Sequence, residues 1–304
     1  MPPHAIRKPT LGDLSILIFL SIVWASSFVA IKVVVHHTGP VWLSAMRVCV
    51  GFLVLVPWTL YRGLVLPTSP RTWVFLVGVS LLNTTIPFLL VSWAELSISA
   101  GITSLLLATG PFMALILSHL TTDDDKINIY KLLGIVLGFT GIATVVGREA
   151  FSDIGHSSLV ALFAVLGASF CYGVSGAIIR QINDLPPTRM ATIILGLSSI
   201  ELLALGLYHG LPDFGGIDSE AWMALLYLGV LPTGLATILR YRMIWTVGAS
   251  YFGLFMNLIP IFGVILGAVL LSETVVFTTW LALGFIVAGL FVARTHPRRH
   301  PPAT

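Results

Sequence analysis

The chain has 304 residues, of which 57% are hydrophobic and only 10% are charged, and its mean hydropathy is +0.98. Soluble domains carry about 25% charged residues, so 16 basic and 13 acidic side chains cannot give a chain of this length a polar surface. Lipid must therefore cover much of the surface, which excludes a soluble globular fold. The net charge of +3 comes from scattered basic residues, which also excludes a nucleic-acid-binding protein.

Long apolar segments follow one another along the whole chain. An α-helix needs about 20 apolar residues to cross a bilayer, and the sequence contains ten segments of this kind. They are apolar on all sides, which predicts helices and not the alternating strands of a barrel. The first segment is longer than the core of a secretory signal, so we interpret it as an uncleaved helix. The predicted spans are 14–35, 41–61, 72–94, 98–120, 130–147, 157–181, 187–208, 220–243, 249–271 and 275–293.

The basic residues predict the orientation of these spans, because cytoplasmic segments of membrane proteins are enriched in Lys and Arg. If the N-terminus is cytoplasmic, all 16 basic residues except Lys32, Arg47 and Arg148 fall on the cytoplasmic side. Ten spans return the chain to its starting side, so both termini are predicted to be cytoplasmic. The expected location is the plasma (inner) membrane.

The two halves of the chain resemble each other at an offset of 147 to 149 residues. We therefore divide the chain into a first repeat, residues 1–148, and a second repeat, residues 149–304, each with five predicted spans. The matching pairs are Trp73 and Trp222, Ala100 and Ala249, Pro111 and Pro260, Asp124 and Glu273, Trp24 and Tyr172, Lys32 and Arg180, Pro40 and Pro187, and Gly141 and Gly289.

An odd number of spans in each repeat means that the second repeat enters the membrane from the opposite side to the first. Such inverted repeats are the plan of many secondary transporters, in which the two halves exchange conformations to expose a central site alternately to each side. The repeat therefore favours a transporter. A gene duplication that has no role in transport is the alternative interpretation.

Segment 24–32, with the sequence WASSFVAIK, resembles the first-helix signature of the EamA-type family in the drug/metabolite transporter superfamily. Pro40 followed by Arg47 is similar to the second-helix pattern of that family. The resemblance extends over about residues 12–293. The ends of the two repeats resemble the ends of family repeats at Ala100, Pro111, 123–125, Gly134 and Gly141, and again at Ala249, Pro260, Glu273 and Gly289.

The resemblance implies an all-α integral membrane protein with ten transmembrane helices, arranged as two inverted five-helix repeats around a central cavity. Members of the family export amino acids and other metabolites, and some import solutes, so a transporter that exports small organic metabolites is expected. Two departures from the family pattern leave the substrate open. The run Asp123-Asp124-Asp125 stands where the family has a glutamate, and Arg47 pairs with Ile194 in the second repeat.

Ionisable side chains are costly inside a bilayer, so each one within a span is a candidate functional residue. Arg47 lies roughly 9 Å in from the outer end of its helix. Its guanidinium group can bind a substrate carboxylate through two hydrogen bonds. The alternative is that it binds a helix-end carbonyl or a lipid phosphate. Lys32 is a second candidate, although it is close enough to the interface for its ammonium group to reach water.

Four aromatic or amide side chains complete the predicted substrate-binding site. Trp24 and Tyr172 occupy equivalent positions in the two repeats, which predicts an aromatic pair beside the central cavity. Asn83 and Asn257 lie deep in the third and ninth spans, where an amide group either binds substrate or joins two helices.

Two carboxylates are candidates for proton coupling. Glu201 lies near the middle of the seventh span, where a carboxylate away from water can carry a proton during transport. Its alternative role is that of a structural acid, hydrogen-bonded to a neighbouring helix. Glu95 lies at the outer end of the third span, where we expect water to reach it. Pro111 and Pro260 remove backbone hydrogen bonds within their spans, and each is either a hinge or a fixed kink.

The motifs argue against an enzyme. An intramembrane prenyl transferase needs two DDxxD clusters to bind diphosphate through magnesium, whereas only residues 123–125 form an acidic run here. The HExxH, GxSxG and Walker A patterns are also absent from the sequence. No cofactor and no metal are therefore expected. A duplicated scaffold with a dry core, or a channel with a continuous water path, is the alternative to a transporter.

The expected partners follow from the same observations. They are a small-molecule substrate and membrane lipid, without nucleic acid. Because no ATP site is found in the sequence, active transport would need protons or another coupling ion, and facilitated diffusion is the alternative. The sequence leaves the choice between monomer and dimer open.

Overall fold

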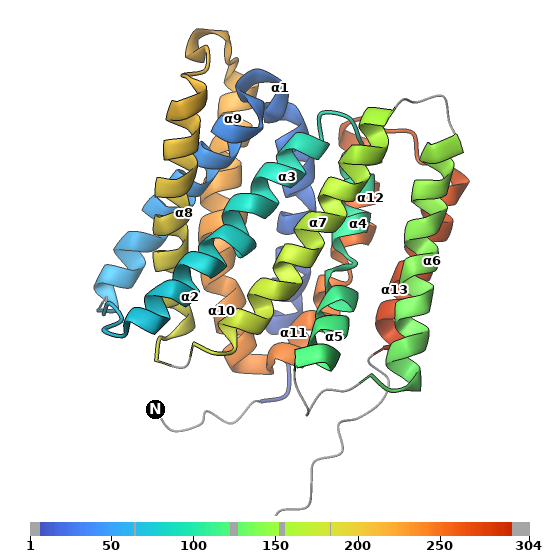
Figure 1. The fold of residues 1–304 in the computed structure, drawn as a ribbon, viewed down its shortest axis with the longest axis horizontal. Helices are drawn as coiled ribbons and strands as arrows, with labels where there is room; N and C mark the ends of the chain where they lie inside the picture. The colour runs from blue at the N-terminus through green and yellow to red at the C-terminus, as the bar shows by residue number, and fades with distance from the viewer. Residues whose placement is uncertain (1–6, 64, 122–126, 152–155, 183, 294–304) are drawn as a thin grey trace, which may run out of the picture.

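The structure, a computed structural model, describes residues 7–63, 65–121, 127–151, 156–182 and 184–293. These residues form helices and connecting turns, without a β-strand among them. The helices stand side by side, and the chain runs back and forth between the two ends of the bundle (Figure 1). The α-helices are α1 (Leu11–Tyr61), α2 (Pro70–Ser80), α3 (Ile86–Ala94), α4 (Ala100–Leu107), α5 (Gly110–Thr121), α6 (Ile129–Phe151), α7 (His156–Ile179), α8 (Pro187–His209), α9 (Ser219–Leu228), α10 (Ala236–Val247), α11 (Ala249–Met256), α12 (Ile259–Leu270) and α13 (Phe277–Val292).

A capping box sets the start of α1. The Thr10 hydroxyl accepts a hydrogen bond from the Asp13 backbone N–H at 3.4 Å, and the Asp13 carboxylate accepts one from the Thr10 N–H at 2.8 Å. These bonds satisfy N–H groups that have no partner within the first turn of a helix. Arg7 forms a salt bridge of 2.7 Å with the same carboxylate, and its backbone N–H donates to the carbonyl of Thr246. The start of α1 therefore lies beside the end of α10.

Helix α1 is too long to be one crossing. Its 51 residues would extend about 76 Å at 1.5 Å per residue, against a hydrocarbon core of about 30 Å. Gly39 interrupts it with φ 70° and ψ 165°, a conformation that favours glycine, and Pro40 follows. Residues 11–38 and 40–61 are therefore two helical segments joined at a sharp bend.

The described residues contain seven helical stretches that are long and apolar enough to cross a membrane, with the bent α1 counted once. Shorter apolar helices, α12 and α13, complete the bundle. The prediction of an all-α integral membrane protein is therefore confirmed. The seven stretches are Leu11–Tyr61, Pro70–Ala94, Ala100–Leu117, Ile129–Gly147, Ser158–Ile179, Pro187–His209 and Ser219–Val247.

Interruptions of the helices occur at matching places in the two halves. Helix α4 ends at Leu107, and α11 ends 149 residues later at Met256; α5 and α12 follow after turns of equal length. A π-helix, η1 (Leu81–Thr85), joins α2 to α3, and a second one, η3 (Gly229–Leu235), joins α9 to α10. π-Helices are rare and are often found at functional sites. The internal repeat is therefore visible in the irregular parts of the structure as well as in the sequence.

Helices α6 and α13 touch through their backbones. A Cβ atom on Gly289 would lie 2.5 Å from the carbonyl oxygen of Gly134 and 3.0 Å from the nitrogen of Gly138. Helices in lipid associate through close packing of this kind, because lipid chains are as apolar as the side chains. The glycines thus hold the two C-terminal helices of the repeats together.

We expect Gly289→Ala to lower the free energy of unfolding by about 1–3 kcal/mol, the usual cost of overpacking. Gly284→Ala is the matched control, because Gly284 lies on the same helix and a Cβ there meets no atom within 4 Å. The control should be neutral or stabilising, since alanine is the better helix former. Denaturation in detergent checks both variants, and equal stability of the two would contradict the packing argument.

Candidate functional site

Arg47 is buried in the bundle, with 6% of its surface exposed. Its Nε donates a hydrogen bond of 2.9 Å to the Thr233 hydroxyl, and its guanidinium carbon lies 4.1 Å from the centre of the Phe88 ring. Among the described residues, the terminal guanidinium nitrogens form no hydrogen bond. A buried charge is unfavourable unless it is paired, so these nitrogens are suited to bind an anion.

The π-helix η3 places the partner of Arg47. Its wider turn lets the Thr233 hydroxyl donate to the carbonyl of Leu228, five residues earlier, at 2.7 Å. The same hydroxyl oxygen then accepts the bond from Arg47. The first repeat therefore supplies the cation, and the second repeat supplies the group that orients it.

Tyr172, on α7, is the second predicted residue near this cation. It is half-buried and interacts electrostatically with Arg47 and Arg240. Its hydroxyl forms no hydrogen bond within the described part of the chain. The side chains of Arg47 and Tyr172 thus come from different repeats and both retain free hydrogen-bonding capacity.

Glu95 is the C-terminal cap of α3 and is completely buried. Neither oxygen of its carboxylate has a hydrogen-bond partner among the described residues. The charged groups that act on it are Lys32 and Arg47 from α1, and Glu273 from the segment after α12. The expectation that water reaches Glu95 is therefore wrong, because the surrounding helices cover the end of α3.

Lys32 binds the end of the same helix. Its Nζ donates to the carbonyl of Ile98 at 2.9 Å and to the carbonyl of Glu95. Carbonyls at a helix C-terminus carry partial negative charge, which favours a cation. Lys32 therefore neutralises the end of α3 and is engaged with the protein rather than with water.

Glu201 and Asn83 connect helices around the π-helix η1. Each Glu201 oxygen accepts a hydrogen bond of 2.5 Å, one from the Ser80 hydroxyl and one from the Thr85 hydroxyl. The Asn83 amide oxygen accepts one of 3.1 Å from Ser175 on α7. These contacts agree with the structural alternatives that the sequence left open for both residues. Each π-helix thus uses a threonine to bind an ionisable side chain, Glu201 here and Arg47 at η3.

Trp24 and Asn257 lie near the second half's interruptions. The Trp24 indole N–H donates to the carbonyl of Pro232 in η3 at 3.1 Å, and its ring meets Phe252 edge-on at 6.1 Å. Asn257 occupies the turn between α11 and α12 and is 4% exposed. Its amide nitrogen has no partner among the described residues. Trp24 is therefore engaged in helix contact, whereas Asn257 retains a free buried donor.

The predicted hinges lie directly after the helix breaks. Pro111 is the second residue of α5, and Pro260 is the second residue of α12. Proline suits the first turn of a helix, because its missing N–H has no partner there in any case. The prolines thus start the second halves of two broken helices.

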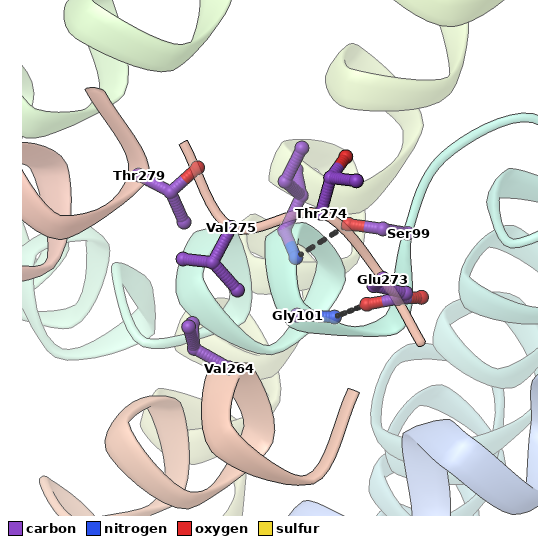
Figure 2. Close-up of a pocket in the computed structure, with 8 residues that line it drawn as sticks. Ser99, Gly101, Val264, Glu273, Thr274, Val275 and Thr279 are labelled. Carbon is purple, nitrogen blue, oxygen red and sulfur yellow. Dashed lines mark hydrogen bonds between the residues drawn. The ribbon is translucent and has the colours of Figure 1, made fainter. Parts of the chain in front are cut away.

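Glu273 joins the two halves at the start of α4. Its carboxylate accepts hydrogen bonds from the backbone N–H groups of Ala100 at 2.7 Å and Gly101 at 3.1 Å. Figure 2 shows the bond from Gly101 to Glu273 beside a small pocket, which Ser99 and Thr279 also line and which has a volume of about 30 Å³. The repeat partner of Glu273 is Asp124, which lies outside the described residues. A carboxylate at a helix N-terminus is favourable both as a cap and toward the helix dipole.

Replacing Glu273 with alanine is expected to lower the free energy of unfolding by about 1–2 kcal/mol, the usual contribution of a charged helix cap. Glu220→Ala is the control, because this carboxylate lies in the exposed first turn of α9 and Asp218 already caps that helix. Denaturation in detergent measures the two variants. A Glu273→Ala protein as stable as the control would show that the contact contributes nothing.

A family model now identifies the chain. The model of the EamA-like transporter family matches residues 11–147 and matches again at residues 159–295. The chain belongs to the EamA-like transporter family. This is a family of transporters and not of enzymes, and it agrees with the resemblance seen in segment 24–32.

Individual relatives of this EamA protein span nearly its whole length. The uncharacterized transporter YoaV of Bacillus subtilis is 23% identical over 278 residues, which cover 91% of this chain and 94% of YoaV. A "Probable amino-acid metabolite efflux pump" of Salmonella typhimurium is 25% identical over 296 residues, covering 92% and 93%. The uncharacterized inner membrane transporter YedA of Escherichia coli is 25% identical over 284 residues, covering 89% and 87%.

A solved crystal structure has the same fold as this EamA protein. It aligns with a TM-score of 0.66 at 19% identity, and the alignment covers 95% of this chain and 99% of the chain in that structure.

Two neighbours of the Arg47 guanidinium, Phe88 and Thr233, were not predicted from the sequence. Both follow a proline inside an apolar span, at Pro87 and Pro232, so a search beside such prolines could have found them.

Proposed function

We propose that this EamA transporter is a secondary transporter that exports small organic metabolites, such as amino acids, by alternating access. The observation that carries the proposal is the Arg47 guanidinium. It is buried, it is oriented by Thr233 of the second half, and its terminal nitrogens are free among the described residues. An organic anion bound there would contact both halves at once, as a substrate must in alternating access.

The proposed topology has ten crossings, formed by two inverted five-helix repeats around a central cavity. The bend at Gly39 supports two crossings within α1. The breaks before α5 and α12 support a fourth and a ninth crossing made of two short helices each. With the basic residues on the starting side, both termini are cytoplasmic. Cysteine labelling from the two sides of sealed vesicles tests this arrangement.

The proposed substrate carboxylate binds to Arg47, and aromatic rings contact the rest of the molecule. A fork of two N–H donors matches a carboxylate better than a lysine does. Phe88 holds the guanidinium plane from one side, and the Tyr172 hydroxyl supplies a further polar group nearby. The name of the Salmonella relative supports amino acids as the first compounds to test.

We further propose that Glu95, rather than Glu201, carries a coupling proton. Glu95 is buried and neither of its oxygens accepts a hydrogen bond from a described residue. Glu201 accepts two, so a proton there would displace existing contacts. Lys32 and Arg47 both act electrostatically on Glu95. A substrate anion bound to Arg47 would therefore change the electrostatic potential at the Glu95 carboxyl group.

Counterflow in proteoliposomes tests the function. Purified protein is reconstituted with unlabelled solute inside, and a panel of labelled amino acids, nucleosides and sugars is offered outside. We expect saturable exchange of at least one amino acid and no exchange in protein-free vesicles. Exchange of an uncharged sugar alone would retain the transporter and reject the Arg47 site. Exchange of no compound, together with a dry core in water-accessibility labelling, would favour the scaffold.

A further inference from the structure

A groove of about 590 Å³ runs along the outside of the bundle, between the second segment of α1, the loop after it, α2 and α8. It lies on the opposite face of α1 from the candidate transport site, because Cys49 follows Arg47 by two residues, or about 200° around the helix. The lining residues are Cys49, Phe52, Leu53, Val56, Leu66, Trp73, Thr192, Ile193, Gly196, Leu197, Ser199, Ile200 and Leu203.

The polar groups in the groove are already engaged. The Thr192 hydroxyl donates to the carbonyl of Thr188 at 3.1 Å and lies 2.6 Å from the hydroxyl of Thr59. The Ser199 hydroxyl donates to the carbonyl of Leu195 at 2.7 Å. The remaining lining is almost wholly hydrocarbon. A polar solute would therefore lose its water without compensation, whereas an acyl chain would not.

Two arginines lie at one end of the groove. The Arg189 guanidinium donates to the carbonyl of Arg62 at 3.4 Å, so these two residues are adjacent. Arg189 precedes the groove residue Thr192 by about one helical turn. Arg71, the second residue of α2, has its guanidinium carbon 5.3 Å from the centre of the Phe75 ring and so lies on another face of that helix. Arg62 is exposed and Arg189 is half-buried. A negatively charged group at this end would thus be close to both Arg62 and Arg189.

Two tryptophans indicate that this end lies at the level of the lipid headgroups. The Arg62 guanidinium is 5.0 Å from the centre of the Trp58 ring. The Trp73 indole N–H donates to the carbonyl of Pro67 at 3.0 Å. Tryptophan is enriched at the membrane interface because its ring is apolar and its N–H needs a polar partner.

We propose that the groove binds one anionic phospholipid, with an acyl chain against α1 and α8 and the phosphate beside Arg62 and Arg189. Basic pockets between helices on the cytoplasmic side are suited to acidic headgroups. Charge complementarity and an apolar channel below the arginines together select a lipid over a free anion. Asp184, in the loop before α8, accepts a hydrogen bond of 2.8 Å from the Thr72 hydroxyl.

Native mass spectrometry tests the proposal on the full-length protein in detergent. Phosphatidylglycerol and phosphatidylcholine with identical long chains are offered in equal amounts. Both headgroups carry the phosphate, but the positive charge of choline is repelled by the arginines and glycerol is neutral, so we expect phosphatidylglycerol to be retained at least about tenfold better. Equal retention of the two lipids would overturn the proposal.

Variants locate the binding to this groove. Arg62→Gln and Arg189→Gln together should abolish the preference, whereas Arg71→Gln on α2 and Arg242→Gln on α10, both at exposed arginines away from the groove, should leave it intact. The single exposed change Arg62→Gln serves if the double variant does not fold. Leu53→Trp, at a side chain that is 66% exposed, should fill the groove and weaken long-chain but not short-chain phosphatidylglycerol. A preference that survives the arginine changes would place the lipid elsewhere.

Discussion

Arg47→Ala is expected to raise the half-saturating concentration of an amino-acid substrate in counterflow by about 10- to 100-fold. The change removes charge-assisted hydrogen bonds of about 1.5–3 kcal/mol from a buried site, and each 1.4 kcal/mol corresponds to a factor of ten. Arg47→Lys should have an intermediate effect. Lysine retains the charge but cannot hold two carboxylate oxygens in one plane or stack on Phe88 in the same way.

Thr233→Val is the control for the Arg47 variants. Valine keeps the shape of threonine and removes the acceptor of the Nε hydrogen bond, so the guanidinium remains but is less well oriented. We expect a smaller loss of affinity than for Arg47→Ala. Melting in detergent must show that all three variants are folded. An Arg47→Ala protein that is folded and has an unchanged half-saturating concentration would refute the proposed site.

Glu95→Gln is expected to abolish accumulation of substrate driven by a pH gradient and to leave counterflow intact. Glutamine has the size and polarity of glutamic acid but cannot release a proton. Counterflow needs only the exchange of bound solute, so it does not require the coupling group. Paired measurements on the same proteoliposomes, with and without an imposed pH gradient, separate the two effects.

Glu201→Gln is the control for Glu95→Gln, because it changes the other candidate carboxylate in the same way. It should retain the response to the pH gradient and lower the free energy of unfolding by about 1–3 kcal/mol, because glutamine has one acceptor oxygen and cannot accept from both Ser80 and Thr85. If Glu201→Gln abolishes gradient-driven accumulation and Glu95→Gln does not, the assignment of the proton is reversed. If neither variant changes it, the coupling ion is not a proton on either carboxylate.

The membrane environment and the helical class followed from the sequence because they depend on sums over many residues. A charged content of 10% and long apolar segments exclude a polar surface whatever the tertiary arrangement. The repeat was also visible, since Pro111 and Pro260 keep their spacing through small loop changes. Family membership rests on the same distributed pattern and agrees with two matched regions, residues 11–147 and 159–295.

The sequence did not predict which single polar residues are buried and which are hydrogen-bonded. Glu95 and Glu201 were equivalent candidates in the sequence, and Glu95 was expected to be wet. The structure separates them, because burial and hydrogen bonding depend on side chains more than 60 residues away, such as Lys32 for one and Ser80 for the other. The desolvation of a polar group depends on which side chains cover it in the tertiary structure, and a local sequence pattern does not contain that information.

The sequence by itself therefore determined that this protein is an all-α membrane protein of two related halves and a transporter by family. Only the tertiary structure decided which buried polar groups are satisfied and which are free. Arg47 acquires its orientation from a π-helix of the other half, and the Asn257 amide nitrogen, in a helix break, has no partner among the described residues. The physical reason is that hydrophobicity is a property of segments, whereas hydrogen-bond satisfaction is a property of contacts between segments.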